Sequence, residues 1–212
     1  MQLKDGSSSQ SGDTIIEVLF AVAVFAMVAV GSLSIMNQGT ATAQRALEIT
    51  LVRQQMDAQA EAIRYVHQNY VASYQKDSTP TGTANEWVKM TDKASGKGAD
   101  GASNFGEVTN SACPTTVPGQ KPFILNARTA TVASATPLMS TPDGASLPPF
   151  SQVIYNDDSS IKNAYGLWIE AVPSTNTGGP GFVDFHIRAC WSAAGSNAPA
   201  TLGTIVRLYE PR

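Results

Sequence analysis

The hydrophobic and polar positions change their pattern along the chain, and the first segment is almost entirely apolar. From Ile15 to Met36 the only charged residue is Glu17. The hydrocarbon core of a bilayer is about 30 Å thick and needs roughly 20 apolar helical residues to cross it. A core helix of a soluble domain would be shorter and would show a polar face. The pattern therefore predicts a membrane-spanning helix.

The helical pattern continues beyond this segment, but it becomes amphipathic. Apolar residues recur at helical spacing as far as Tyr70, and charged residues lie mostly off that stripe. No proline occurs before Pro80, so nothing forces the helix to break before about Tyr74. We expect one helix from Asp13 to about Tyr74, whose second half packs on a sheet. The predicted stripe is Ile49, Val52, Met56, Ile63, Val66 and Tyr70, and the charged residues beside it are Glu48, Arg53, Asp57, Glu61 and Arg64.

The remainder of the chain, residues 76–212, is rich in Pro, Gly, Ser and Thr and predicts a β-rich head. Residues 76–120 are mostly polar, with room for one short helix or strand. Its apolar anchors are Trp87, Val88, Phe105 and Val108. Five β-rich runs follow: Phe123–Val132, Gln152–Tyr155, Tyr165–Val172, Phe182–Trp191 and Leu202–Tyr209. We expect the last three to form an antiparallel meander, which makes the fold class α+β, a long helix packed on an antiparallel sheet.

Composition narrows the functional classes. The chain has 212 residues, 42% of them hydrophobic and 15% charged, with a net charge of −3. This length suits one core-bearing domain with an accessory element. The slight acidity disfavours a dedicated nucleic-acid binder, which usually carries a basic stripe. Two cysteines are too few for a disulfide-dense scaffold or a thiolate zinc site.

The most informative segment is Ser11–Leu19, where a glycine stands at the boundary between polar and apolar sequence. Five residues after Gly12, Glu17 places a carboxylate inside the apolar run. Such a charge costs about 2.5–3.5 kcal/mol at the centre of a spanning helix and less near the interface, so it usually has a partner. Thr14 and Glu17 also fit a capping box at a helix start. A cap explains neither Gly12 nor the length of the apolar run.

This segment resembles the N-terminus of type IV pilins and of the pseudopilins of type II secretion systems. The resemblance implies that residues 1–12 are a leader, that a prepilin peptidase cuts after Gly12, and that the new amino group of Asp13 is methylated. It also implies that Glu17 meets the N-terminal amine of a neighbouring subunit during assembly. The helical segment 13–36 would then serve as membrane anchor and afterwards as filament core, followed by the amphipathic helix 37–75 and the extracytoplasmic head 76–212.

The resemblance also implies partners and a location. The partners would be the prepilin peptidase, the pilus assembly platform and other pilin subunits. The chain would lie in the cell membrane as a single-pass protein before assembly and in a cell-surface filament afterwards. Such a filament would serve adhesion, twitching motility or DNA uptake. For a head outside the cytoplasm, Cys113 and Cys190 are expected to form a disulfide. The alternative is two unpaired, buried thiols.

Candidate catalytic and metal-binding residues are few. His67 on the helix and His186 on a strand are expected to be surface or packing residues. No Ser-His-Asp or Cys-His set has a supporting motif, so no enzyme, cofactor or catalytic residue is predicted. The segment Asn156–Ser159 has carboxylates that could approach calcium, but it lacks EF-hand spacing. A solvated turn is the preferred interpretation.

Three other functions remain open for the chain. The first is a pseudopilin that drives secretion. The second is a monomeric binding module held by a signal anchor. The third is a secreted protein, because Ala41-Thr42-Ala43 resembles a signal peptidase site. An ordinary secretory signal has a shorter apolar region, without a residue like Glu17.

Overall fold

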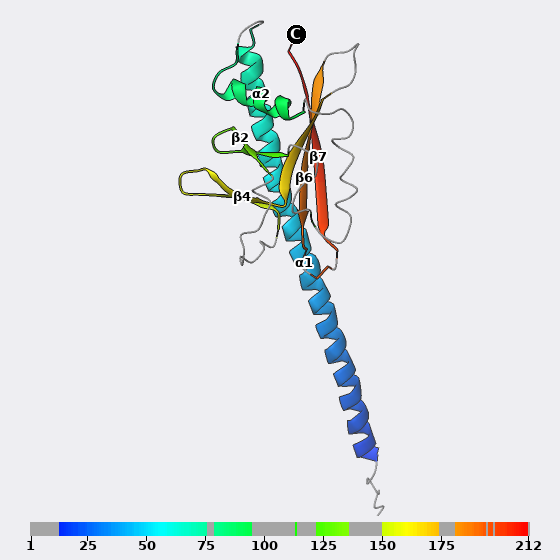
Figure 1. The fold of residues 1–212 in the computed structure, drawn as a ribbon. Coiled ribbons are helices and arrows are strands. Elements are labelled where there is room, and N and C mark those ends of the chain that lie inside the picture. The colour runs from blue at the N-terminus through cyan, green and yellow to red at the C-terminus, as the bar shows by residue number, and fades with distance from the viewer. Residues whose placement is uncertain are drawn as a thin grey trace, which may run out of the picture. The chain divides into compact units, whose positions relative to one another are not determined.

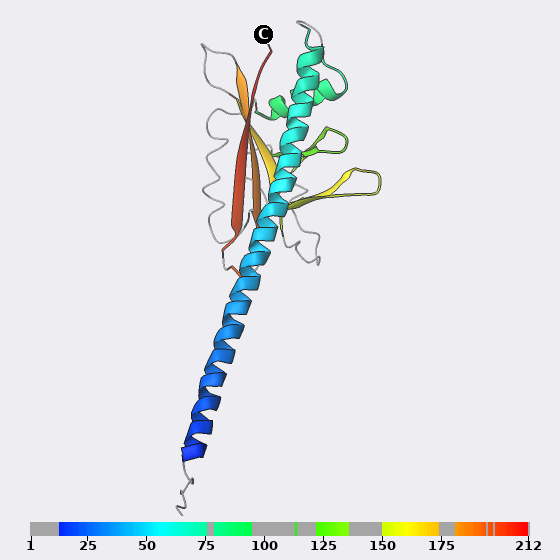
Figure 2. The same ribbon diagram turned by 180° about the vertical axis from the view of Figure 1, so that it is seen from behind.

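The computed structural model describes residues 13–75, 79–94, 113, 122–135, 150–173, 181–193, 195–196 and 198–211. The chain divides into two compact units, Met1–Gln44 and Arg45–Arg212. The elements, shown in Figure 1 and from behind in Figure 2, are α1 (Asp13–Ser73), α2 (Thr83–Ala94), β1 (Phe123–Asn126), β2 (Thr131–Ser134), β3 (Gln152–Tyr155), β4 (Ile161–Tyr165), β5 (Leu167–Pro173), β6 (Phe182–Trp191) and β7 (Ala200–Tyr209). The α+β class is therefore confirmed.

The first helix agrees with the prediction at both ends. α1 begins at Asp13 and ends at Ser73, an unbroken helix of 61 residues. The absence of proline before Pro80 permits this length, because each interior amide keeps its acceptor one turn earlier. α1 contributes residues to both compact units.

The second unit is built on a five-stranded antiparallel sheet with strand order β2-β1-β5-β6-β7. β5, β6 and β7 follow one another both in sequence and in space, so the predicted meander is confirmed. β6 and β7 pair over ten consecutive positions, from Phe182↔Tyr209 to Trp191↔Ala200. β3 and β4 form a separate two-stranded sheet, and its Val153 and Ala164 join the same hydrophobic core.

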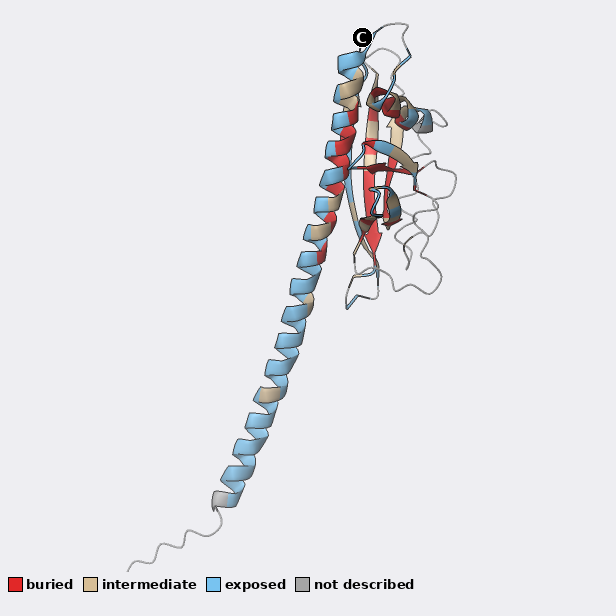
Figure 3. Ribbon diagram, turned by 90° about the vertical axis from the view of Figure 1, so that its left-hand side faces the viewer, coloured by how far each residue is buried: buried red, intermediate tan, exposed pale blue. Residues whose placement is uncertain are grey.

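The amphipathic half of α1 forms one side of this core. Val52, Met56, Ile63 and Val66 are each at most 2% exposed, and Figure 3 shows the buried stripe along this half of the helix. They belong to one cluster with the inward-facing side chains of β5 and β6. Their spacing of four, seven and three residues keeps one helical face on the sheet.

The prediction was wrong for Ile49, the first residue of the expected stripe. Ile49 is 37% exposed, whereas Glu48, expected beside the stripe, is only 7% exposed. Glu48 accepts a hydrogen bond from the indole Nε1 of the buried Trp191 at 3.0 Å. The carboxylate of Glu48 therefore faces the sheet, because the buried indole N–H of Trp191 needs an acceptor.

A buried glutamine joins α1 to the sheet where β1 and β5 separate. These two strands pair at Phe123↔Ile169, so Leu125 lacks a strand partner on that side. The side chain of Gln59, 1% exposed, donates to the Leu125 carbonyl at 2.8 Å and accepts from the Leu125 amide at 2.9 Å. The amide side chain thus replaces a missing strand and leaves no buried backbone group of Leu125 unpaired.

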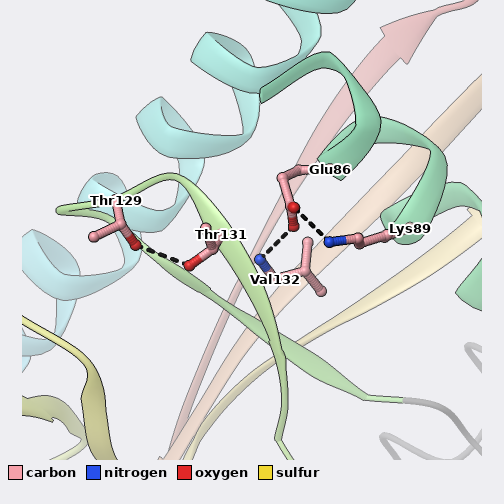
Figure 4. A network of polar contacts seen from close by, with 5 residues as sticks. All are labelled: Glu86, Lys89, Thr129, Thr131 and Val132. Atoms are coloured by element: carbon pink, nitrogen blue, oxygen red, sulfur yellow. Dashed lines mark hydrogen bonds and ion pairs between the residues drawn. The ribbon is translucent and has the colours of Figure 1, made fainter. Parts of the chain in front are cut away.

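The polar stretch after α1 contains the short helix that the sequence allowed for. α2 buries Trp87 and Met90 in the core; the other predicted anchors Phe105 and Val108 lie outside the described residues. Figure 4 shows its contact with β2: Glu86 accepts from the Val132 amide at 2.8 Å and from Lys89 Nζ at 2.6 Å. α2 therefore covers the outer edge of β2.

Two of the predicted strands are each divided in the structure. The run Phe123–Val132 is a hairpin, because Asn126 Oδ1 accepts from the amides of Arg128 and Thr129 and stabilises a turn. The run Tyr165–Val172 is interrupted at Gly166, which has a φ of +59°. A Cβ atom there would lie 2.0 Å from the carbonyl oxygen of Cys190, so this corner requires glycine.

Candidate functional site

The candidate functional site is the apolar half of α1, from Ile15 to Met36. Its large apolar side chains are between 44% and 75% exposed, and most of this half of the helix has the pale blue of exposed residues in Figure 3. The exposure lies all round the helix. Exposed apolar patches of monomeric soluble proteins rarely exceed a few hundred Å². A surface of this kind needs either lipid or other protein chains around it.

This segment meets the physical requirements for crossing a bilayer. Its most apolar 18-residue window has a mean hydropathy of 2.5, and none of that window is buried. Among the described residues, α1 is the one helix long and apolar enough to span a membrane. The structure therefore agrees with a single-pass membrane anchor near the N-terminus.

Several hydroxyl side chains in and after this segment donate hydrogen bonds to carbonyl groups of their own helix. Ser32 Oγ donates to the Val28 carbonyl at 2.8 Å, and Thr42 Oγ1 donates to the Gln38 carbonyl at 2.9 Å. In an apolar medium each unpaired polar group costs several kcal/mol. These local hydrogen bonds therefore make the helix compatible with lipid and with a dry protein interface.

Glu17 lies on the exposed surface of α1, two residues after the start of the apolar run. Within the described parts of the chain it makes no ion pair. The described side chains next to it on the helix, such as Ile16, Val18 and Ala21, are apolar and supply no compensating charge. Gly12 and the side chains of Asp13 and Thr14 lie outside the described residues. The cleavage site and the capping box thus stay predictions.

The predicted disulfide is confirmed. Cys113 and Cys190 are bonded, with their Cα atoms 5.6 Å apart and a sequence separation of 77 residues. The bond lies against Trp168 and Ala135 on the sheet face opposite α1. It ties Cys113, which belongs to the long polar stretch, to the end of strand β6, which lies between β5 and β7. A disulfide is typical of extracytoplasmic proteins.

Sequence reasoning missed a buried charge pair on the same face. Glu170 Oε2 lies 3.0 Å from Arg188 Nε, and Glu170 Oε1 accepts from Trp168 Nε1 at 3.1 Å. Burial raises the pKa of Glu170, against the opposing effects of Arg188 and Trp168. Burial also lowers the pKa of Arg188, and Glu170 opposes that shift. The burial of this pair within the sheet gives it a structural role in the head.

The two histidines take part in packing and hydrogen bonding, as expected. His67 Nε2 lies 2.8 Å from the Tyr209 carbonyl oxygen, and its ring is 4.7 Å from that of Trp87. His186 is half-buried on β6, and burial lowers its pKa, with a further lowering by Arg188. Asp184 opposes that shift.

The segment Asn156–Ser159 forms the turn between β3 and β4, as the preferred interpretation had it. The Ser159 amide donates to the Asn156 carbonyl, and Asp158 Oδ1 accepts from both the amide and the hydroxyl of Ser160. These hydrogen bonds lower the pKa of Asp158. Within the described ranges, no group of three or more His, Cys, Asp or Glu side chains is placed to hold a metal ion.

Comparison with known proteins gives no relative for this chain. No family model, curated protein or solved structure matches it.

Proposed function

We propose that this chain is a structural subunit, a pilin or minor pilin, of a type IV pilus-like filament. The apolar half of α1 anchors the subunit in the membrane before assembly and packs against the same segment of other subunits afterwards. The observation that carries the proposal is the exposed apolar surface Ile15–Met36 with one carboxylate, Glu17, near its start.

The apolar surface supports both states of such a subunit. In the membrane its side chains contact lipid, and in a filament they contact neighbouring helices. Because lipid tails are as apolar as leucine, the transfer depends on van der Waals packing rather than on the hydrophobic effect. Small residues allow helices to approach closely, and the segment is rich in alanine: Ala21, Ala23, Ala26 and Ala29.

Glu17 supplies a negative charge that lipid cannot compensate. Cleavage after Gly12 would leave a positive amino group at Asp13, four residues before Glu17. A neighbouring subunit would then offer this amine to Glu17, so that two charges costly in an apolar medium become one pair. A pair of this kind also fixes the axial offset between adjacent helices.

The head carries features that suit display outside the cytoplasm. The Cys113–Cys190 disulfide requires an oxidising compartment to form and persist. The bond encloses strands β1 to β5 in one covalent loop of the head. We assign the head to the filament surface, where it would support adhesion, twitching motility or DNA uptake.

The test replaces Glu17 with alanine and follows two fractions of the native host, membranes and sheared filaments. Glu17→Ala should insert in the membrane at the wild-type level and be absent from the filaments. The matched control is Glu61→Ala, a change of the same type on the same helix, where the side chain is 73% exposed and pairs with Arg64. This control should assemble normally.

The outcomes separate the candidate functions. Normal assembly of Glu17→Ala would contradict the role given to this carboxylate. A wild-type chain that never leaves the membrane fraction would indicate a signal-anchored monomeric binding module instead. Filaments that form only together with a secretion machinery, and whose loss stops secretion, would identify a type II pseudopilin.

A further inference from the structure

The two edges of the five-stranded sheet differ in their protection. The β2 edge is short, four residues, and the outward amide of Val132 is occupied by Glu86 of α2 (Figure 4). The β7 edge is ten residues long, and none of the described strands pairs with its outer side. Sheet edges with free N–H and C=O groups are templates for pairing with another chain.

The hydrogen-bond pattern shows which groups of β7 face outward. The Glu210 amide donates to the Gly181 carbonyl, and bonded pairs alternate along an antiparallel ladder. Pairs such as Val183↔Leu208 therefore point their backbone groups inward. The residues whose backbone groups point outward are Thr201, Gly203, Ile205, Arg207 and Tyr209. The first four are exposed, while the Tyr209 carbonyl is already in contact with His67.

Between Thr201 and Arg207 the strand itself lacks two features that commonly block an edge, a proline and a bulge. Its one charged side chain, Arg207, turns back over the sheet. Arg207 Nε and Nη2 each donate to the carboxylate of Asp184 at 2.7 Å, and the guanidinium lies 4.0 Å from the Phe182 ring centre.

We propose that this edge pairs with β7 of a second copy of the chain, antiparallel, about a two-fold axis at Thr204. In this register each of the four open residues faces another open residue: Thr201 faces Arg207 of the second copy, and Gly203 faces its Ile205. About eight backbone hydrogen bonds form between the chains, two for each facing pair. The register pairs the outward groups of all four residues and leaves out Tyr209, whose carbonyl is already in contact with His67.

Side-chain chemistry favours the same register. Ile205, 58% exposed, would lie over Gly203 of the second copy, which has no side chain to oppose it. The two Arg207 side chains would lie about 20 Å apart along the strands, so like charges do not meet. A register centred at Val206 would bring them close together, which is destabilising.

This contact is distinct from filament assembly. A two-fold pair is isologous and closed, whereas a filament needs a head-to-tail contact that repeats. The β7 pair would therefore link copies from different filaments, or two copies in the membrane. It goes beyond the proposed function and does not depend on it.

The experiment is disulfide crosslinking of the full-length chain purified in detergent. Cys113 and Cys190 are bonded to each other, so Thr204→Cys supplies a single free thiol. Facing residues at this type of position have Cα atoms about 4.5 Å apart, within the range for a disulfide. Thr201→Cys is the matched control, because its two copies would lie about 20 Å apart. Both variants are oxidised and analysed on non-reducing gels.

A dimer yield at least several-fold higher for Thr204→Cys than for Thr201→Cys is expected. Equal yields, no dimer in either variant, or dimers in Thr201→Cys alone would overturn the proposal. Ile205→Pro, added to Thr204→Cys, removes an outward amide and leaves the β6 ladder intact, so it should abolish the dimer. Persistence of the dimer in a folded Ile205→Pro chain would also overturn it. Repeating the assay with Glu17→Ala separates this contact from filament assembly, since the dimer should remain.

Discussion

The carboxylate of Glu48 on α1 accepts a hydrogen bond from the indole Nε1 of Trp191, the last residue of β6, at 3.0 Å. Both residues are buried, with exposures of 7% and 5%. The contact joins positions 143 residues apart in sequence and fixes which face of α1 meets the end of the sheet. It makes Glu48 a structural residue of the head.

Replacement of Glu48 by alanine should therefore destabilise the head. The Trp191 N–H would lose its acceptor in a buried place, which costs about 1–3 kcal/mol. The adjacent control Ile49→Ala changes an exposed side chain and should cost well under 1 kcal/mol, as surface substitutions do. Urea unfolding followed by tryptophan fluorescence measures both. Equal losses in the two variants would show that Ile49, and not Glu48, belongs to the packed face.

A larger effect is expected for Gln59→Leu. This change leaves both the amide and the carbonyl of Leu125 without the partner that they have in the native protein. At about 1–3 kcal/mol for each unsatisfied group, the free energy of unfolding should fall by about 2–6 kcal/mol. Gln54→Leu, at an exposed position on the same helix, is the matched control and should leave stability nearly unchanged. A small loss for Gln59→Leu would mean that other groups take over these bonds.

The disulfide should contribute through the unfolded state. Replacing Cys113 and Cys190 together with serine opens a loop with a sequence separation of 77 residues. In the chain-entropy model this costs about 4 kcal/mol. The expected loss is measured by urea unfolding of the wild-type and double-serine chains under non-reducing conditions. The account is contradicted if the double variant unfolds at the wild-type urea concentration.

Acid sensitivity should depend on Asp184. Its hydrogen bonds with Arg207 lower its pKa from the ordinary value of 3.8. A carboxyl whose pKa is lower in the folded state than in the unfolded state stabilises the fold above its unfolded pKa, and that contribution disappears as the pH falls through the folded value. Between pH 5 and about pH 2.5, the wild type should therefore lose more stability than Asp184→Asn. Asp57→Asn, exposed on α1, should keep the wild-type profile. Parallel profiles for wild type and Asp184→Asn would contradict this assignment.

The elements with strong periodicity were predictable. The length and bounds of α1 followed from its apolar and amphipathic patterns and from the absence of proline before Pro80. The bounds of β6 followed from its alternating side chains. The β5-β6-β7 meander followed from three consecutive β-rich runs, because short connections favour neighbouring strands.

The elements that depend on tertiary contacts were not predictable. Glu48 turns inward because Trp191 lies there, and Gln59 is buried because β1 and β5 separate at Leu125. Neither fact can be read from helical spacing. The Glu170–Arg188 pair required the register of β5 and β6, which places the two residues diagonally on one face. The alternation of polar residues on β6 was the one signal that pointed to that face.

The candidate site was predictable as a surface, since an apolar run with one carboxylate is visible in the sequence alone. Its exposure is a structural finding, because none of its most apolar window is buried among the described residues. What covers this surface depends on other molecules, which in the proposed function are lipid before assembly and neighbouring subunits afterwards.

The central claim is that this chain is processed as a prepilin, and the N-terminus of the native protein tests it most directly. The measurement is the intact mass and the N-terminal sequence of the protein recovered from its native membrane. We predict a chain that begins at Asp13, with or without a methyl group on its amine. A chain that begins at Met1 would contradict the account and leave an anchored binding module, and one that begins at Gln44 would indicate a secreted head without the assembly surface.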